Sequence, residues 1–313
     1  MKKYPVLDRL EQEMMEKLYG TMDVFGGAYS LRSNGKCVDM SDAEGVVINA
    51  KPKGRGIEVR VESGLKDGMV YVPVILNQAG LNDKVDNDFY VGAGAQVVIM
   101  AGCGICSDTI HLTQHDGVHR FFIGAGAKVR YIEKHLGTGS IKGRRVMNPT
   151  THIFLEQGSL MEMESTQVGG VSSAKRTLRC EVGDEANLVV AEKILTDNND
   201  RVTTRSEIIL HGVNSRASLM SRSVAEARSR QKFSTHLIGQ NICFGHSECD
   251  AIILDEAKVE AVPCVSAKHA DAQLVHEAAI GKVAEEQIVK LMTLGMSREA
   301  AERTIIDGFL GVK

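Results

Sequence analysis

The segment from Cys243 to Asp250 holds side chains well suited to binding a metal. Within eight residues it contains Cys243, His246, Glu248, Cys249 and Asp250, and the pair His276-Glu277 follows further along the chain. A thiolate beside a carboxylate and an imidazole suits a transition metal such as iron or zinc. If the chain coils with a period near the spacing between Cys249 and Glu277, these two residues lie on neighbouring coils and face the same spot. The alternative, in which His276 and Glu277 only close the end of the β core, is left open by the pattern.

A second group of candidate residues lies earlier in the chain. Cys103-Gly104-Ile105-Cys106 has the spacing of a redox pair or of half a metal site. Three histidines follow at four-residue intervals: His111, His115 and His119. In an extended strand every fourth residue shares a face. The alternative is that the cysteines pack as small apolar groups and the histidines lie on a solvated face. We favour this alternative for Cys106 and His111 but not for Cys103, and the roles of His115 and His119 stay open.

Neither group forms a complete four-ligand motif. A second Cys-x-x-Cys pair is missing, which disfavours a closed structural zinc site or a ferredoxin-type cluster. An incomplete ligand set fits a site that a second subunit completes. The sequence also lacks the Gly-x-x-x-x-Gly-Lys-[Ser/Thr] phosphate loop, so we do not expect the chain to hydrolyse ATP by that route.

Composition and charge narrow the class of protein. Seven cysteines, an odd number without a signal peptide, indicate reduced thiols rather than a disulfide framework. The net charge of −3 offers no general attraction to nucleic acid. No run of eighteen apolar residues occurs, so we expect a cytoplasmic protein without a membrane span.

The elements that must position these residues are mainly strands. Between residues 31 and 275 short alternating segments replace the helical period, and corner-like peptides recur before apolar strands. Small residues in these corners, at positions 95, 127, 159, 186, 217 and 257, are 32, 32, 27, 31 and 40 residues apart. Such a period predicts a β-solenoid whose coils stack about 4.8 Å apart around a narrow aliphatic interior. The absence of Trp fits that interior, and a β-sandwich with similar turns is the alternative.

Helices are expected at both ends of this core. A helix over residues 6–19 has Leu7, Leu10, Met14 and Leu18 on one face. Near the C-terminus, residues 284–294 predict one helix, and Ser297 caps another in which Ala301, Ile305 and Phe309 repeat every four residues. The chain is therefore divided into an N-terminal helical segment (1–30), a β core (31–275) and a C-terminal helical segment (276–313).

Several peptides in the second half resemble the SufB/SufD family. The run from His276 to Gln287, His-Glu-Ala-Ala-Ile-Gly-Lys-Val-Ala-Glu-Glu-Gln, is similar to the signature of that family. Cys249-Asp250-Ala251-Ile252-Ile253-Leu254 resembles its Cys-Asp-x-Leu-Leu segment, and Val129-Arg130-Tyr131 resembles one of its strands. The resemblance spans roughly residues 90–313 and implies a right-handed parallel β-helix between helical termini.

The resemblance also implies roles for particular residues. Cys249 and Glu277 match the positions at which SufB-type chains assemble a nascent cluster, and Cys103 roughly matches the cysteine that accepts persulfide sulfur. Family members pair through their β-helices and hold a SufC-type ABC ATPase at the C-terminal helices. Because this chain carries Cys249 but lacks the long N-terminal region of full-length SufB, we expect a homodimer rather than a heterodimer with a SufD-like chain.

These observations favour an assembly scaffold over an enzyme. Persulfide sulfur from a cysteine desulfurase or another donor would enter at Cys103, move inward and join iron held by Cys249 and Glu277, with His246 or His276 as an added ligand. The transient iron-sulfur cluster would form at a subunit interface. The enzyme alternative is a β-helix hydrolase or lyase acting on polysaccharide. The sequence leaves open the cluster nuclearity, the need for reduced flavin and the acceptor proteins.

Overall fold

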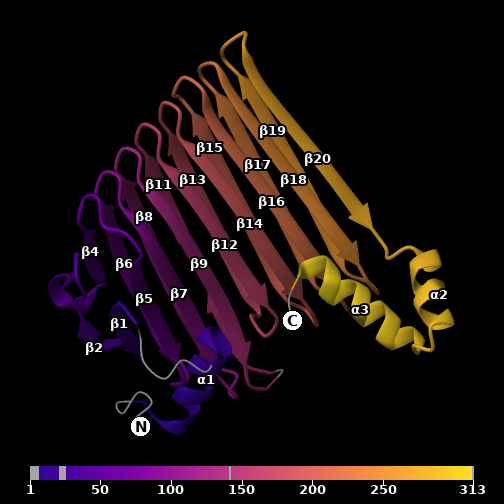
Figure 1. The fold of residues 1–313 in the computed structure, drawn as a ribbon. Helices are drawn as coiled ribbons and strands as arrows, with labels where there is room; N and C mark the ends of the chain where they lie inside the picture. Colours follow the sequence, from indigo (N-terminus) through magenta and orange to yellow (C-terminus); the bar gives the residue numbers. More distant parts are fainter. Residues whose placement is uncertain (1–6, 21–25, 141, 312–313) are drawn as a thin grey trace.

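The computed structural model describes residues 7–20, 26–140 and 142–311. These residues form a parallel β-solenoid of about eight turns with helices at both ends, as predicted (Figure 1). Each coil adds one strand to each of two facing sheets. Sheet A has the strand order β2-β1-β5-β7-β9-β12-β14-β16-β18-β20. Sheet B has the order β19-β17-β15-β13-β10-β8-β6-β4-β3, with β11 pairing β13 and β8.

The elements have the following bounds. In sheet A they are β1 (Ala28–Ser33), β2 (Lys36–Ser41), β5 (Gly68–Leu76), β7 (Gln96–Cys106), β9 (Lys128–Thr138), β12 (Leu160–Val168), β14 (Asn187–Thr196), β16 (Ser215–Ala225), β18 (Cys243–Ile253) and β20 (Ala272–Gly281). In sheet B they are β3 (Val46–Ala50), β4 (Ile57–Val61), β6 (Asn82–Val91), β8 (Leu112–Ile123), β10 (Arg144–Met147), β11 (Thr150–Leu155), β13 (Ser173–Val182), β15 (Arg201–Leu210), β17 (Arg230–Gly239) and β19 (Lys258–Ala267). The helices are α1 (Arg9–Tyr19), the short 3-10 turn η1 (Pro52–Gly54), α2 (Glu285–Thr293) and α3 (Arg298–Leu310).

The predicted corner peptides make the tight turns of the solenoid. Gly94 and Gly126 adopt φ values of 67° and 65°, a left-handed conformation that glycine enters at no steric cost. Successive corners also bond to each other, since the Gly94 amide donates to the Ala125 carbonyl at 2.9 Å. The repeat read from the sequence is therefore the stacking repeat of the coils.

The interior between the two sheets is narrow and mostly aliphatic. Strands of both sheets alternate buried and less buried positions, and the inward apolar side chains form a smaller cluster that includes Cys103 and Cys249 and one large cluster along the solenoid axis. Its largest members include Phe89 and Phe121, whose rings stack with centroids 4.6 Å apart. Because each inward position faces another sheet directly, side chains larger than these have little room, in keeping with the absence of Trp.

The N-terminal helix lies against the outer face of sheet A. It begins at Arg9, where the Asp8 side chain caps it, so residues 7 and 8 of the predicted range precede the helix, and residue 6 falls outside the described residues. Its buried residues include Met14, Met15 and Leu18, whereas Leu10, predicted on the same face, is 41% exposed. The helix packs closely on Gly102 and Gly104. A Cβ at Gly102 would lie 2.8 Å from the Tyr19 hydroxyl, and a Cβ at Gly104 would lie 2.5 Å from Met14 Cε.

The C-terminal helices differ in detail from their predicted bounds. Strand β20 continues to Gly281, so the first six residues of the segment expected to be helical, 276–281, belong to the solenoid. Ser297 caps α3 as predicted, with its hydroxyl accepting from the Ala300 amide at 3.2 Å. The buried face of α3 is Ala301, Ile306 and Leu310, because the helix rests on the solenoid with this side. The predicted face had Ile305 and Phe309 in place of the last two.

A membrane span is not found among the described residues. None of their helices has both the length and the apolar composition that crossing a bilayer needs.

Candidate functional site

The sequence-predicted pair Cys249 and Glu277 lies at the C-terminal end of the solenoid, on the adjacent strands β18 and β20. The register pairs Glu248 with Glu277 and Cys249 with Ala278. Cys249 therefore points into the solenoid and is 4% exposed, whereas the Glu277 side chain points outward and is 66% exposed. The prediction of neighbouring coils is right, but the prediction that the two side chains face the same spot is wrong. Glu277 lies one register position away from the partner of Cys249, and a shift of one position moves a side chain to the other face of a strand.

Glu277 has two potential metal ligands beside it on the outer face. The ligand atoms of His246, Glu248 and Glu277 all lie within 4.8 Å of one another. His246 Nε2 and Glu277 Oε2 are 3.6 Å apart. A hydrogen bond that the Glu248 carboxyl donates to Asp250, together with slight burial, raises the pKa of Glu248. The outer face thus gathers one imidazole and several carboxyl groups.

Cys249 faces a different environment inside the solenoid. Burial raises the pKa of its thiol to about 11, and the nearby carboxylates of Glu192 and Asp250 act in the same direction. His276 shares this inner face, since it pairs with Ser247, and its Nδ1 lies 2.6 Å from the Ser247 hydroxyl. Its Nε2 is buried without a hydrogen-bond partner among the described residues. A neutral thiol and an unpaired imidazole nitrogen therefore lie on the same face at the open end.

Cys103 lies on β7, buried at 3% exposure and facing the interior. Burial raises the pKa of its thiol well above the ordinary value, with smaller contributions from Asp83 and Glu133. Cys106 lies three residues further along the same strand and packs with the α1 cluster on the outer face. Since residues three apart on a strand point to opposite faces, Cys103 and Cys106 do not form a Cys-x-x-Cys pair.

Two of the three histidines are internal. His115 and His119 on β8 are 6% and 9% exposed, so the solvated-face alternative is wrong for them. His115 Nδ1 lies 3.0 Å from Asp83 and His119 Nδ1 lies 2.8 Å from the Tyr131 hydroxyl. His111 precedes the strand and is exposed. Inside the solenoid these two buried histidines line a cavity of about 20 Å³ beside Cys103.

A row of inward polar side chains connects the neighbourhoods of Cys103 and Cys249, two of the four buried cysteines. His135 on β9 is the register partner of Cys103. Glu133 lies two residues earlier on β9 and also points inward. From there, direct register partners follow one another across sheet A: Glu133, Ser165, Glu192, Ser221 and Cys249. We call these five residues the inner polar row.

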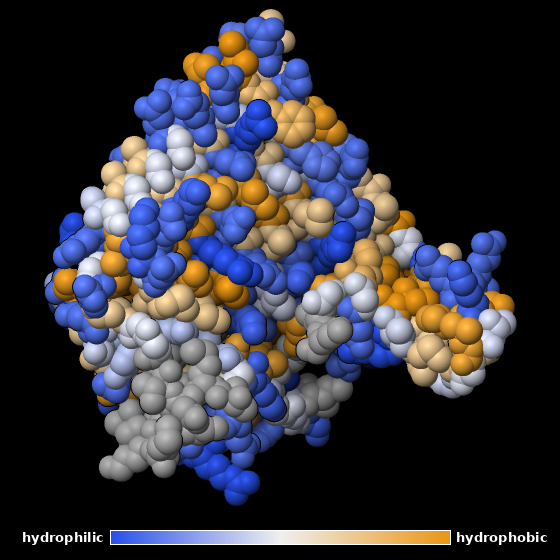
Figure 2. Space-filling view, in the orientation of Figure 1, coloured by the Kyte–Doolittle hydropathy of each residue, from blue (hydrophilic) through white to orange (hydrophobic). Residues whose placement is uncertain are grey.

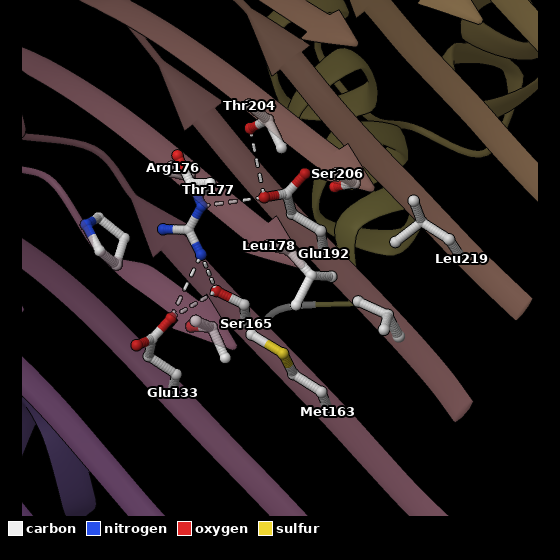
Figure 3. Close-up of a pocket in the computed structure, with 13 residues that line it drawn as sticks. Glu133, Met163, Ser165, Arg176, Thr177, Leu178, Glu192, Thr204, Ser206 and Leu219 are labelled. Atoms are coloured by element: carbon white, nitrogen blue, oxygen red, sulfur yellow. Dashed lines mark hydrogen bonds and ion pairs between the residues drawn. The ribbon is translucent and has the colours of Figure 1, made fainter. Parts of the chain in front are cut away.

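Arg176 of sheet B reaches across the interior and holds this row in place (Figure 3). Its guanidinium donates to Glu192 at 2.9 Å, contacts Glu133 at 3.3 Å and bonds to Ser165. It also lies 2.9 Å from His135 Nδ1. The residues around it line a second cavity of about 20 Å³, which is room for about one water molecule.

The charges in this network are fixed by their mutual contacts. Burial disfavours the carboxylate of Glu133, but His135 and Arg176 outweigh it and lower the pKa of Glu133 to about 2. Of these two neighbours only Arg176 is charged at neutral pH, because burial lowers the pKa of His135 to about 3. One arginine therefore stands between two buried carboxylates.

Reasoning from the sequence missed Arg176 and every member of the inner polar row except Cys249. A signal was present, because a polar residue recurs at one inward position of successive strands that are otherwise apolar. Reading that signal requires the strand register, which the corner spacing gives only to within a few residues.

The fold and these residues define a β-solenoid protein in which a row of inward polar side chains joins two of the buried thiols, Cys103 and Cys249. The family model described as SUF system FeS cluster assembly, SufBD core domain, matches residues 85–309. The chain therefore belongs to the SufB/SufD family, whose members are iron-sulfur cluster assembly proteins.

Several curated relatives carry the name Iron-sulfur cluster assembly SufBD family protein. One from Archaeoglobus fulgidus is 29% identical over 283 residues, covering 89% of this chain and 71% of the relative. One from Methanocaldococcus jannaschii is 22% identical over 281 residues, covering 88% of both. The chloroplastic relative ABCI8 of Arabidopsis thaliana is 26% identical over 225 residues, 69% of this chain but 40% of its own length. Two Methanothermobacter relatives are matched over 53% of their length.

Proposed function

We propose that this chain is a scaffold on which a nascent iron-sulfur cluster is assembled at the C-terminal end of the solenoid. Sulfane sulfur from a cysteine desulfurase or another donor is taken up by Cys103 as a persulfide, and attack on it by a thiolate releases the Cys103 thiolate as the sulfur moves inward. At Cys249 an external two-electron reductant, such as reduced flavin, converts this sulfur to sulfide, and iron joins it there. Family membership supports the assembly role over the polysaccharide hydrolase or lyase alternative. The scaffold would act in the cytoplasm, where thiols stay reduced, and all seven cysteines are free.

The observation that carries this proposal is the inner polar row. Burying ionised and polar groups in an apolar interior costs free energy unless they are paired and hydrogen-bonded, and even paired groups seldom stabilise more than apolar packing would. Here they follow consecutive register positions and end at Cys249, while Cys103 is the register partner of His135 at the other end. A polar row between two thiols supports a route for sulfur through the solenoid.

We further propose that a second copy of the chain completes the site. Within one chain the Cys249 thiol and the Glu277 carboxylate project from opposite faces of sheet A, so one cluster needs the carboxylate of the partner. At this end β19 and β20 are edge strands with unpaired backbone groups, and their exposed apolar side chains are Val262, Val265, Val275 and Ile280. Exposed apolar edges of this kind favour pairing with another chain.

The ATPase partner would dock on α2 rather than on the predicted face of α3. Ala301 is fully buried, and Phe309 packs with the apolar cluster that joins α3 to the solenoid. On α2 and just after it, Val289, Met292 and Leu294 are 48%, 41% and 77% exposed. Hydrophobic side chains gather on the lobe that these helices form (Figure 2).

Met292→Glu combined with Leu294→Glu is expected to abolish co-purification with a SufC-type ATPase. Both side chains are exposed, so the change should leave the thermal unfolding midpoint unchanged while it charges the docking surface. Ile110→Glu, in a distant loop and 69% exposed, is the matched control and should bind normally. Unchanged affinity of the double variant would place the docking surface elsewhere. These point changes are sharper than truncation after Gly281, which would uncover the apolar cluster beneath α3.

Anaerobic reconstitution with iron and sulfide, followed by visible absorption, tests the proposed function, and Glu277→Ala tests the carboxylate ligand. We expect the variant to form much less cluster than the natural chain. Its stability should change by less than about 0.5 kcal/mol, because the side chain is largely exposed and its contact with His246 is a surface pair. Glu260→Ala removes a comparably exposed glutamate on β19 and serves as the control. A large loss of melting temperature in Glu277→Ala alone would instead identify a structural cap.

A further inference from the structure

His246, Glu248 and Glu277 form a compact group on the outer face of the last two strands of sheet A. His246 and Glu248 are two positions apart on β18, so they share a face, and the register places Glu277 directly beside Glu248 on β20. Every pair of ligand atoms in this group lies within 4.8 Å. The group is separated from the Cys249 thiol by the sheet itself, since that thiol projects inward.

The geometry of this group suits a divalent metal ion. Ligand atoms about 2.1 Å from one ion are about 3 to 3.5 Å apart. His246 Nε2 and Glu277 Oε2 are already 3.6 Å apart. The His246 side chain is 26% exposed and that of Glu277 is 66% exposed, so both can close around an ion without moving the core.

The donor set also indicates which ion would bind. One imidazole and two carboxylates are borderline and hard ligands that suit Fe(II), Mn(II) or Zn(II), and three ligands leave positions open for water or an incoming group. Asp250 lies two positions beyond Glu248 on β18, on the same face, and supplies a further oxygen. Arg222, the register partner of Asp250, is a nearby cation, and its guanidinium lies 5.9 Å from the centre of the Phe309 ring.

We propose that His246, Glu248 and Glu277 form an Fe(II)-loading site on the outer face of β18 and β20, distinct from the thiolate site of Cys249. The choice of iron as the bound metal rests on the proposed function. With this site, the two substrates, sulfur and iron, reach the place of assembly by separate routes. Sulfur travels inside the solenoid along the inner polar row, and iron is collected outside. The two meet at the open end of the solenoid, where β20 is the last strand of the sheet.

Binding of Fe(II) to the whole chain, without sulfide and under anaerobic conditions, tests this site by calorimetry. We expect one tight equivalent per chain, with affinity at least tenfold lower in His246→Ala and in Glu248→Gln. Cys249→Ser should bind Fe(II) as well as the natural chain does. Glu162→Gln, an exposed glutamate on the outer face of β12, is the matched control and should also bind normally. Co(II) as a spectroscopic probe should show no thiolate-to-metal charge-transfer band.

The outcomes separate this inference from the proposed function. Loss of Fe(II) binding in Cys249→Ser, or a thiolate band with Co(II), would mean that iron enters through the thiol and would overturn the outer site. Unchanged affinity in both His246→Ala and Glu248→Gln would overturn it as well. If Fe(II) binds as expected but no cluster forms when sulfide is added, the iron site stands and the scaffold function fails.

Discussion

Replacing Cys249 with serine is expected to abolish cluster retention while the solenoid stays folded. The candidate ligands on the outer face beside it are oxygen and nitrogen donors, which hold an iron-sulfur cluster far more weakly than a thiolate does. Serine is smaller than cysteine and can bond to Ser221, its register partner in the inner polar row, so the interior accommodates it. After anaerobic reconstitution, visible absorption and iron analysis should show almost no cluster, with unchanged circular dichroism.

Cys37→Ser is the matched control, since Cys37 is exposed on β2 at the other end of the solenoid. It should reconstitute like the natural chain. A full cluster in Cys249→Ser would remove this cysteine from the assembly site.

The same thiol predicts a pH dependence of assembly. Because burial raises the pKa of Cys249 to about 11, the thiol is protonated at neutral pH, and binding iron must release that proton. Each unit of pH below this pKa costs about a tenfold drop in thiolate. Reconstitution should therefore be faster at pH 9 than at pH 7, and this difference should persist in Cys37→Ser, in which the Cys249 thiol is intact.

The architecture could be predicted because it repeats. Every coil needs a tight corner, a corner needs residues that tolerate a left-handed backbone, and such residues recur at 94, 126 and 158 with apolar strands behind them. Because the corner pattern recurs several times, the β-solenoid could be predicted from the sequence, although a single corner is a weak signal. The bounds of the helices could be predicted from their capping residues to within a few residues.

The faces of the candidate site could not be predicted from the same repeat. Met220 pairs with Glu248, and Glu248 in turn pairs with Glu277, so the last coil is longer by a single residue than the coil before it. That extra residue reverses which side chains point inward, because with two coils of equal length Glu248 would have paired with His276 and Cys249 with Glu277. Coil length varies in the loops, where the sequence carries little pattern, so only the strand pairing decides between the two faces.

Arg176→Met is expected to cause the largest loss of stability among these variants. Arg176 is buried and is the charged partner of both Glu133 and Glu192, so its removal leaves two carboxylates in the interior without a counter-charge. Breaking a buried ion pair in this way typically destabilises by about 3 to 5 kcal/mol. Thermal and urea unfolding should show a clear fall in stability at pH 7, although methionine fills a similar volume.

The sign of the pH dependence gives this prediction a sharper test. In the natural chain the pKa of Glu133 is lowered to about 2, so its contribution to stability is present above the ordinary pKa of a glutamate and is lost as the pH falls through about 2. Without Arg176, burial raises that pKa instead, and Glu133 takes up a proton on mild acidification. The stability gap between Arg176→Met and the natural chain should therefore narrow between pH 7 and pH 4.

Adding Glu133→Gln and Glu192→Gln to Arg176→Met should restore much of the lost stability, because the interior then holds neutral amides that hydrogen-bond to their neighbours. If the triple variant is as stable as the natural chain but no longer carries sulfur from Cys103 to Cys249, the charges serve transfer rather than folding. If it is stable and still transfers sulfur, the inner polar row is only structural and the route lies elsewhere. Persulfide labelling at Cys103, followed by mass spectrometry of Cys249, distinguishes these two results.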